Sequence, residues 1–299
     1  MEEINVVYNV HHEIPLGVLL ANYFYMTGLS AGSFILSTLA YGFGIKKYKP
    51  IGKVGVVLAT LLLVLAPLNL LIDMTLPWRF WHLFVYLNPT SPITWGSFLL
   101  IIYPLNCIIY GYFMFKGDEK KTKVFGLIGI PLALSVHGYT GFILALAKRG
   151  LINTALMPTL FLVSAMVSGI ALMILVVIVK DRFFSAKREV DRELIFDLGK
   201  ILAWSIVTDL VLIFSDVSVL LTSEAAAYEA AQLILRGSFA PYFLGVEIFL
   251  GSLVPLFLLF FPKTRRTLTG VAIASALVMI GIFVMRYVMV IGGQSIPQS

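Results

Sequence analysis

Apolar runs of membrane-spanning length, separated by short polar segments, repeat eight times along the chain. Each run holds about the 20 residues that a helix needs to cross the hydrocarbon core of a bilayer. The pattern predicts an all-α, polytopic membrane protein whose residues 1–299 form a single integral membrane domain. The eight predicted transmembrane helices cover 17–45, 54–76, 94–115, 124–147, 155–179, 198–222, 241–261 and 268–291.

Composition excludes several other classes of protein. Hydrophobic residues make up 59% of the 299 residues and charged residues only 13%, about half the share found in ordinary soluble domains. A soluble enzyme, a disordered chain and a secreted disulfide scaffold are therefore excluded. The net charge of +6 arises from basic clusters between the apolar runs, so topology explains it and no nucleic-acid partner is expected. The lone cysteine, Cys107, cannot hold an iron–sulfur cluster by itself.

The placement of lysine and arginine predicts the orientation in the membrane. Loops on one side of the apolar runs carry 17 of these residues, and loops on the other side carry 4. Cytoplasmic loops are enriched in lysine and arginine. We therefore expect a multi-pass protein of the cytoplasmic membrane with both termini extracytoplasmic.

A faint internal repeat has two interpretations. Two parallel four-helix bundles, 1–150 and 151–299, would produce matching patterns in the first and fifth helices. Small residues spaced four apart are also common packing surfaces between membrane helices, without any duplication. The matching positions are Phe24, Gly28 and Gly32 in the first helix and Phe161, Ala165 and Gly169 in the fifth.

Five charged residues fall inside the predicted helices, where a charge at the bilayer centre costs roughly 2.5–3.5 kcal/mol. From the predicted topology, Asp209 lies near the midplane, and the others lie in the outer half of the membrane. Such a set is typical of a half-channel for protons or water. A buried ion pair between the arginine and one acid, holding the helices together, is the structural alternative. The five residues are Asp73, Asp209, Asp216, Glu247 and Arg286.

The histidines argue against haem and zinc. His11, His12, His82 and His137 all belong to the predicted outer side. Two haems stacked across a membrane need axial ligands at both depths, and the inner half has no histidine. A two-haem cytochrome b is therefore excluded, and a single outer haem is disfavoured. The adjacent pair His11–His12 also lacks the spacing of zinc ligands.

Four polar residues in the outer layer suit a quinone headgroup. A quinone needs hydrogen-bond donors, a proton-exchanging partner and an apolar slot for its tail. Tyr23, Tyr139, His137 and Asp73 offer these groups in an apolar wall. His137 and Tyr139, two residues apart, point about 200° apart on a straight helix. We therefore expect that they do not both line one narrow pocket.

Four stretches of the sequence resemble the NrfD/PsrC family, the membrane subunits of polysulfide-reductase-type complexes. The second stretch is the most specific, because Asp-x-x-x-Pro-Trp-Arg-Phe followed by Ser-Pro-x-x-Trp-Gly-Ser is hard to obtain from hydrophobic bias alone. The stretches are YFYMTGLSAGSF at 23–34, NLLIDMTLPWRFWHLFVYLNPTSPITWGSFLL at 69–100, HGYTGFILA at 137–145 with LMPTLFLVSAMVSGIAL at 156–172, and MRYVMVIGGQ at 285–294.

The resemblance implies a membrane anchor that reacts with menaquinone or another exchangeable quinone and carries no haem or iron–sulfur cluster of its own. It implies a four-cluster ferredoxin-like iron–sulfur subunit docked on the outer face, with a catalytic subunit such as a molybdopterin enzyme beyond it. Tyr139 matches the quinone-contacting tyrosine of the polysulfide-reductase member. Tyr23 stands where that member has a histidine, so either Tyr23 or His137 serves as the second quinone ligand.

The resulting hypothesis is a quinone-interacting subunit of a respiratory oxidoreductase, inactive without its partners. Protons would exchange through Asp73, while Arg79 would bind a carboxylate of the partner or pair with Asp73. A proton route to mid-depth would use Asp209, Asp216, Glu247 and Arg286. The alternative from another class is a secondary transporter or proton/sodium antiporter, and a haem b anchor is a third.

Overall fold

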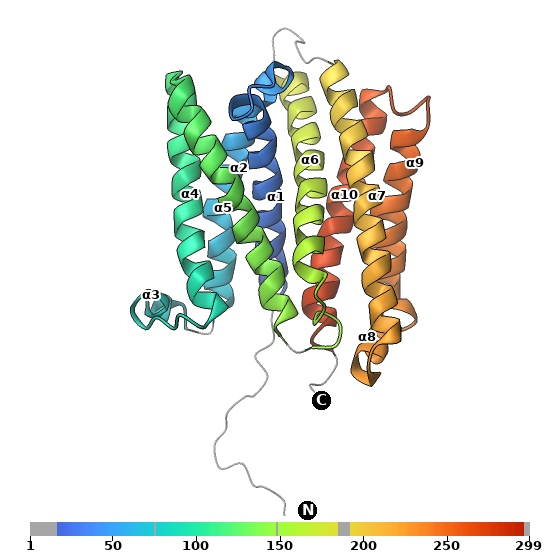
Figure 1. The fold of residues 1–299 in the computed structure, drawn as a ribbon. Coiled ribbons are helices and arrows are strands. Elements are labelled where there is room, and N and C mark those ends of the chain that lie inside the picture. Colours follow the sequence, from blue (N-terminus) through green and yellow to red (C-terminus); the bar gives the residue numbers. More distant parts are fainter. Residues whose placement is uncertain (1–16, 75, 148, 185–191, 296–299) are drawn as a thin grey trace, which may run out of the picture.

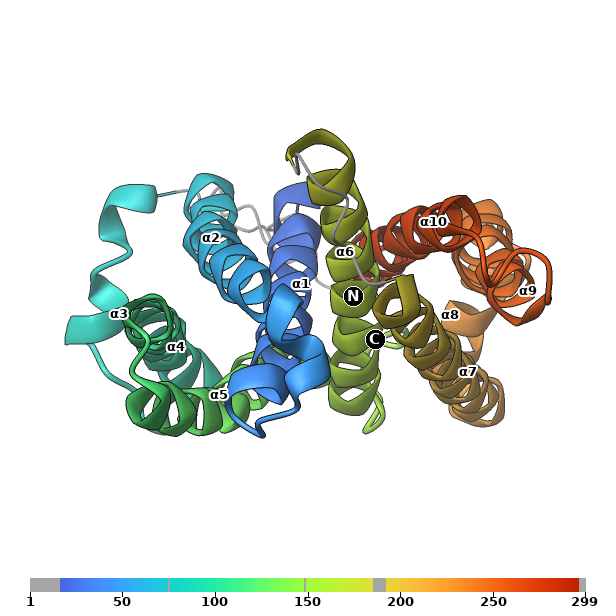
Figure 2. The same cartoon turned by 90° about the horizontal axis from the view of Figure 1, so that it is seen from above.

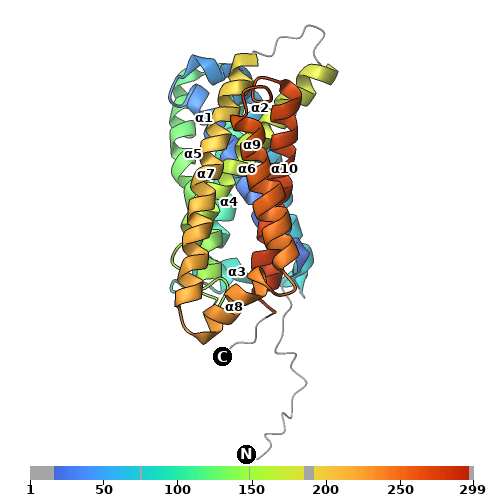
Figure 3. The same ribbon diagram turned by 90° about the vertical axis from the view of Figure 1, so that its right-hand side faces the viewer.

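The computed structural model describes residues 17–74, 76–147, 149–184 and 192–295. Within these ranges eight helices are long and apolar enough to cross a membrane, and no strand is present, which confirms the predicted all-α, eight-helix fold. The helices stand side by side in one layer-like bundle (Figures 1 and 3). The spanning segments are α1 (Val18–Tyr41), α2 (Lys49–Asp73), α4 (Pro92–Lys116), α5 (Glu119–Ala145), α6 (Met157–Phe184), α7 (Arg192–Thr222), the π-helix η3 (Pro241–Leu253) with α9 (Val254–Phe260), and α10 (Leu268–Tyr287) with the π-helix η4 (Val288–Gly292).

Several helices begin earlier than the hydrophobic pattern predicts, because their first turns are polar. α2 begins at Lys49 rather than at 54, with Pro50 in its first turn, a position where the missing N–H of proline costs nothing. α5 begins at Glu119 rather than at 124, and the Asp118 side chain caps it by accepting a 3.1 Å hydrogen bond from the Lys121 N–H. Hydropathy detects the part of a helix that lies in the hydrocarbon core of the membrane, whereas capping residues determine where the helix begins and ends.

Short elements occupy the connections at the two ends of the bundle. The 3-10 helix η1 (Lys46–Tyr48) and the α9–α10 connection lie at one end, called the basic end here because its loops carry most of the lysines and arginines. At the other end, called the distal end, α3 projects sideways and α8 lies under α7 (Figure 1). The distal elements are η2 (Pro77–Arg79), α3 (His82–Val85) and α8 (Ala225–Leu235).

The two central helices are α1 and α6, with α2, α4 and α5 on one side and α7, α9 and α10 on the other (Figure 2). α1 and α6 approach closely because glycines face each other: a Cβ atom on Gly32 would meet the backbone of Gly169 at 2.7 Å. Close approach of small residues is the usual way in which membrane helices gain van der Waals contact. The division into halves 1–150 and 151–299 stays a prediction.

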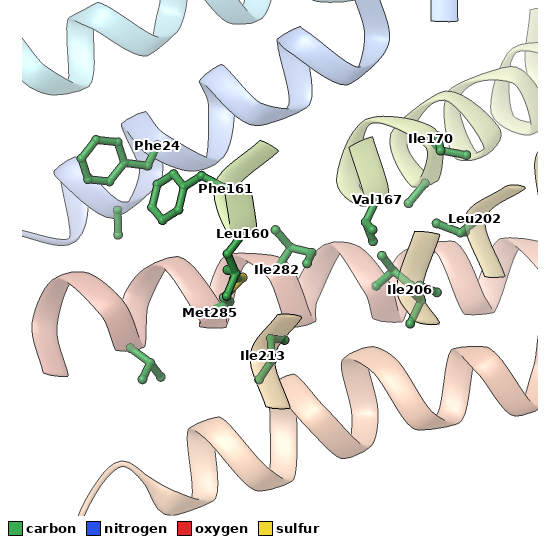
Figure 4. Packing of buried hydrophobic residues seen from close by; sticks show 14 of the residues in the cluster. Phe24, Leu160, Phe161, Val167, Ile170, Leu202, Ile206, Ile213, Ile282 and Met285 are labelled. Carbon is green, nitrogen blue, oxygen red and sulfur yellow. The ribbon is translucent and has the colours of Figure 1, made fainter. Parts of the chain in front are cut away.

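The apolar core lies along the same central seam. Phe24 of α1 packs edge to face on Phe161 of α6, with ring centroids 5.7 Å apart. Figure 4 shows these two rings beside Met285 of α10, with Ile213 of α7 on the far side of α10. The polar side chains described below are embedded in this apolar interior.

Candidate functional site

The candidate residues separate into three places instead of sharing one pocket. Tyr139 lines an open groove between α4 and α5. His137 and the charged residues of the second half lie buried around Arg286. Asp73 lies apart from both, at the distal end of α2.

The groove has a volume of about 570 Å³ and opens on the side of the bundle near its distal end. This volume lies within the roughly 300–1,000 Å³ typical of small-molecule sites. Its walls are mostly apolar, and Tyr139, Thr90 and Ser135 supply the polar groups. The remaining lining residues are Pro92, Trp95, Leu99, Leu134, Gly138, Phe142 and Pro158.

Tyr139 is held in the groove by the shape of α4. Its ring covers Gly96, where even a Cβ atom would overlap with the ring. Tyr23 is almost fully buried on α1 and lies close enough to Tyr139 for the two phenols to interact electrostatically. The sequence therefore brings one lipid-accessible phenol and one buried phenol together at the same depth.

Arg286 is the largest fully buried side chain in the described part of the chain, with 1% of its surface exposed. Its Nη2 donates to the Ser164 hydroxyl at 2.5 Å and to the Phe161 carbonyl at 3.4 Å. The guanidinium also lies over the Phe161 ring, 3.6 Å from the centroid, which favours the cation by its attraction to the π-face. Its Nε and Nη1 have no hydrogen-bond partner among the described residues.

His137 faces Arg286 rather than the groove. Its Nε2 lies 3.4 Å from Arg286 Nη2, and because a guanidinium only donates, a hydrogen bond between them requires Nε2 to accept. The other ring nitrogen, Nδ1, is buried and has no hydrogen-bond partner among the described residues. A Cβ atom on Gly28 would come within 3.0 Å of the imidazole, so the glycine leaves room for the ring. His137 and Tyr139 thus point to different sides of α5, as their spacing predicts.

Two acids accompany the buried arginine. Asp209 of α7 and Glu247 of η3 are both nearly inaccessible and both interact electrostatically with Arg286. Neither forms a direct ion pair with it within 4 Å in the described part of the chain, where Asp209 Oδ1 also has no hydrogen-bond partner. Buried charges are costly unless their hydrogen bonds are satisfied, so these open positions suit bound water.

Glu247 lies in the middle of the π-helix η3. The Ser252 hydroxyl donates a 3.1 Å hydrogen bond to the Glu247 carbonyl, five residues earlier. Five is also the spacing of π-helical backbone bonds, and π-helical turns are frequent at functional sites. The second π-helix, η4, begins two residues after Arg286. Glu247 therefore lies within a π-helix, and Arg286 lies just before one.

Asp216 and Glu247 share the wall of a small cavity between α6, α7, α8, η3 and η4. The volume that the centres of water molecules can occupy in this cavity is about 30 Å³, which is enough for one or two waters. Asp216 Oδ1 accepts a 2.6 Å hydrogen bond from the Thr154 hydroxyl. Glu247 is thus the residue common to the Arg286 cluster and the Asp216 cavity.

Asp73 ends α2 and faces the start of α1. Its carboxylate accepts a 3.4 Å hydrogen bond from the Gly17 N–H, and one turn earlier Asn22 Nδ2 donates to Asn69 Oδ1 at 2.9 Å. Asp73 does not line the groove. Arg79 is exposed on η2 and makes no ion pair with Asp73 within 4 Å. Of the two alternatives for Arg79, the pairing with Asp73 is therefore not present between these two described residues.

Sequence reasoning missed the hydroxyl and aromatic partners of the charged residues. Ser164, Phe161 and Thr154 hold Arg286 and Asp216 in place. His11 and His12 fall outside the described residues. Among the described residues, no three His, Cys, Asp or Glu side chains gather as a metal site.

Comparison with known proteins agrees with this picture of a membrane subunit. The chain is 31% identical over 297 residues to the Hdr-like menaquinol oxidoreductase integral membrane subunit of Archaeoglobus fulgidus, covering 96% of this chain and 73% of the relative. It is 29% identical over 326 residues to the C subunit of the selenate reductase of Mesobacillus selenatarsenatis, covering 94% and 74%. Over 307 residues it is 25% identical to the protein NrfD of Escherichia coli, covering 92% and 93%.

The family model described as "Polysulphide reductase, NrfD" matches residues 6–298, nearly the whole chain. With eight helices of membrane-spanning length, the chain is a multi-pass integral membrane protein, and it belongs to the NrfD polysulphide reductase family.

Proposed function

We propose that this chain is the quinone-reactive membrane subunit of a multi-subunit respiratory oxidoreductase. It exchanges electrons between menaquinol, or a related quinone, and a separate iron–sulfur subunit. The observation that carries the proposal is the groove of about 570 Å³ with Tyr139 in its wall. Membership of the family supports the general role of a membrane anchor subunit. A relative named for menaquinol oxidation supports the choice of quinone.

The groove fits the chemistry of a quinone. Trp95, Leu99 and Phe142 supply an apolar surface for the ring and tail, and the opening toward lipid gives a hydrophobic carrier direct access from the bilayer. Tyr139 supplies a hydroxyl that donates to a quinone oxygen, and Tyr23 lies directly behind it. His137 faces away from the groove, toward Arg286. This orientation favours Tyr23 over His137 as the second ligand of the quinone.

The buried charges supply a route for the protons that quinol chemistry exchanges. Asp209, Glu247 and Arg286 form one cluster, and Glu247 also borders the water-sized cavity beside Asp216. We place the proton-exchanging role on these residues, with Asp73 serving at the distal end. Water bound at the open positions of Arg286 and Asp209 would connect them, because proton transfer needs hydrogen-bonded neighbours.

We propose that the partners dock at the distal end, because the excess of basic residues at the opposite end favours an extracytoplasmic position for the distal end. There η2 presents Trp78, 83% exposed, and the exposed Arg79. Arg79 has no ion pair with a described residue and is available for a carboxylate of a partner. We propose a four-cluster ferredoxin-like iron–sulfur subunit on this face and a catalytic subunit such as a molybdopterin enzyme beyond it.

The test is quinol turnover by the complex purified with its native partners. Tyr139→Phe removes the hydroxyl and keeps the ring, and we expect turnover to fall by about a hundredfold while the complex stays assembled. Asp73→Asn should slow the reaction as well. Tyr112→Phe, on a lipid-exposed tyrosine of α4, is the matched control and should leave turnover unchanged. Unchanged turnover in both Tyr139→Phe and Asp73→Asn would discard the site assignment, and ion flux through the isolated chain in proteoliposomes would favour a transporter instead.

A further inference from the structure

A second cavity lies at the basic end, far from the groove and built from different chemistry. It has a volume of about 580 Å³ and lies between the first turns of α7 and the α9–α10 connection. Phe196, Gly199 and Leu259 form its apolar part. Its charged lining residues are Glu193, Asp197, Lys200, Arg265 and Arg266.

The acids of this cavity are already engaged, whereas the arginines are not. Asp197 Oδ1 lies 2.9 Å from Lys200 Nζ, and its other oxygen is ion-paired with Lys47 of η1. Glu193 also has an interaction of its own. Arg265 and Arg266 are exposed and form no ion pair with a described residue. Among the described residues, the cavity therefore offers two guanidinium groups without an ion pair, and their planar donors match the oxygens of a phosphate.

An exposed aromatic wall continues from the cavity toward the middle of the membrane. Trp204, one turn beyond Lys200 on α7, packs edge to face on Phe260 of α9 with centroids 5.9 Å apart. Their exposed fractions are 65% and 45%. Phe257 and Phe261 stack beside them, 5.2 Å apart. Cationic groups at the membrane surface and an apolar strip below them match the two parts of a phospholipid.

We propose that this cavity binds the phosphate of an anionic phospholipid, with Arg265 and Arg266 as the phosphate ligands and Trp204 and Phe260 against the acyl chains. Basic pockets between membrane helices at the cytoplasmic surface recognise anionic headgroups in this way. Lys200 contributes charge while it stays paired with Asp197. The lipid, rather than free phosphate, is the occupant because the aromatic wall adjoins the cationic site. The inference is independent of the quinone groove.

The experiment measures lipid binding to the purified chain in detergent by native mass spectrometry, with dioleoylphosphatidylglycerol as the probe. Arg265→Gln/Arg266→Gln should weaken binding by about tenfold to thirtyfold, the effect of losing two surface charges. Arg265→Lys/Arg266→Lys should restore part of it. Lys116→Gln/Lys120→Gln removes two exposed charges at the same end but on α4 and α5, and it should leave binding unchanged.

Two further probes separate the possible ligands. Dioleoylphosphatidylcholine, which has no net charge, should bind the wild-type chain more weakly than the anionic lipid. Trp204→Ala should weaken the anionic lipid and leave inorganic phosphate unaffected. Equal lipid binding by wild type and the double glutamine variant would overturn the proposal. Binding of inorganic phosphate as tight as that of the lipid would also overturn it. Because the substituted side chains are exposed, the variants should keep the melting temperature of the wild type.

Discussion

The two sides of the bundle contain cavities that differ in size, in lining and in access from the lipid. Beside α4 and α5 the cavity is large, open toward lipid and lined by apolar residues and uncharged Tyr139. Beside α7 and η3 the cavity has room for one or two waters only, and it is lined by Asp216 and Glu247. The first can take a hydrophobic ring, and the second can take only water or protons. Under the proposed function, quinone binding and proton exchange are therefore separated in space.

The seam between α1 and α6 is where the two sides meet. Phe24 contacts Phe161, Gly32 contacts Gly169, and His137 of α5 contacts Arg286 of α10. His137 is two residues from Tyr139 of the groove, while Arg286 interacts with Asp209 and Glu247. The imidazole–guanidinium contact thus joins the groove side directly to the charged side.

Removal of Arg286 should give the largest effect. Arg286→Met leaves Asp209 and Glu247 buried without their cation, and loss of one member of a buried charged group costs about 3–5 kcal/mol. We expect a clear fall in the unfolding free energy in detergent, measured with a denaturant series. The double variant Arg286→Met/Asp209→Asn should recover part of the loss. A single variant as stable as the wild type would mean that the charged side is not held by this residue.

Insertion of a methyl group behind Tyr139 should give an intermediate effect confined to the groove side. A Cβ atom on Gly96 would overlap with the Tyr139 ring, so Gly96→Ala should cost about 1–3 kcal/mol and displace the phenol. Gly111→Ala, on the same helix but away from the groove, is the matched control, because its Cβ atom would meet only Val56 Cγ2, at 3.5 Å. Quinol turnover by the purified complex should fall in Gly96→Ala and stay near normal in Gly111→Ala. Equal turnover in the two variants would show that the position of Tyr139 is unimportant.

The spans were predictable from sequence because the bilayer imposes one physical demand on all of them. Every backbone group in the hydrocarbon must be bonded within its own segment, so length and hydropathy identify all eight helices. The burial of Asp209, Asp216, Glu247 and Arg286 also agrees with the cost of exposing charge to lipid. Both features could be predicted from sequence because each depends only on the free energy of placing individual residues in lipid.

The pairing of these residues was not predictable, since it depends on how the helices pack. Ser164 is hydrogen-bonded to Arg286 and Thr154 to Asp216. These partners lie 122 and 62 residues apart in the sequence, and helical periodicity relates only residues of one helix. The alignment of Phe24 with Phe161 also matches Thr27 with Ser164, but it does not indicate which residue the Ser164 hydroxyl would bond. The groove escaped prediction as well, because residues of α4, α5 and α6 form it together.

Loss of the Thr154 hydroxyl should give the smallest effect and sharpens the comparison on the charged side. Thr154→Val removes the 2.6 Å hydrogen bond to Asp216 and keeps the shape of the side chain. Because the adjoining cavity has room for water, a water molecule can replace the donor, so the cost should be about 1 kcal/mol. Thr27→Val is the control, since the buried Thr27 hydroxyl donates only to carbonyls of its own helix.

The two threonine variants also separate a structural role of Asp216 from a role in proton exchange. If the Asp216 carboxylate exchanges protons, Thr154→Val should change the pH dependence of quinol turnover, because a hydroxyl that donates to the charged form is lost. Thr27→Val should leave that dependence as it is in the wild type. If Asp216 only holds α7 in place, Thr154→Val should lower stability without moving the pH profile. That outcome would limit the proposed proton exchange to Glu247, Asp209 and Arg286.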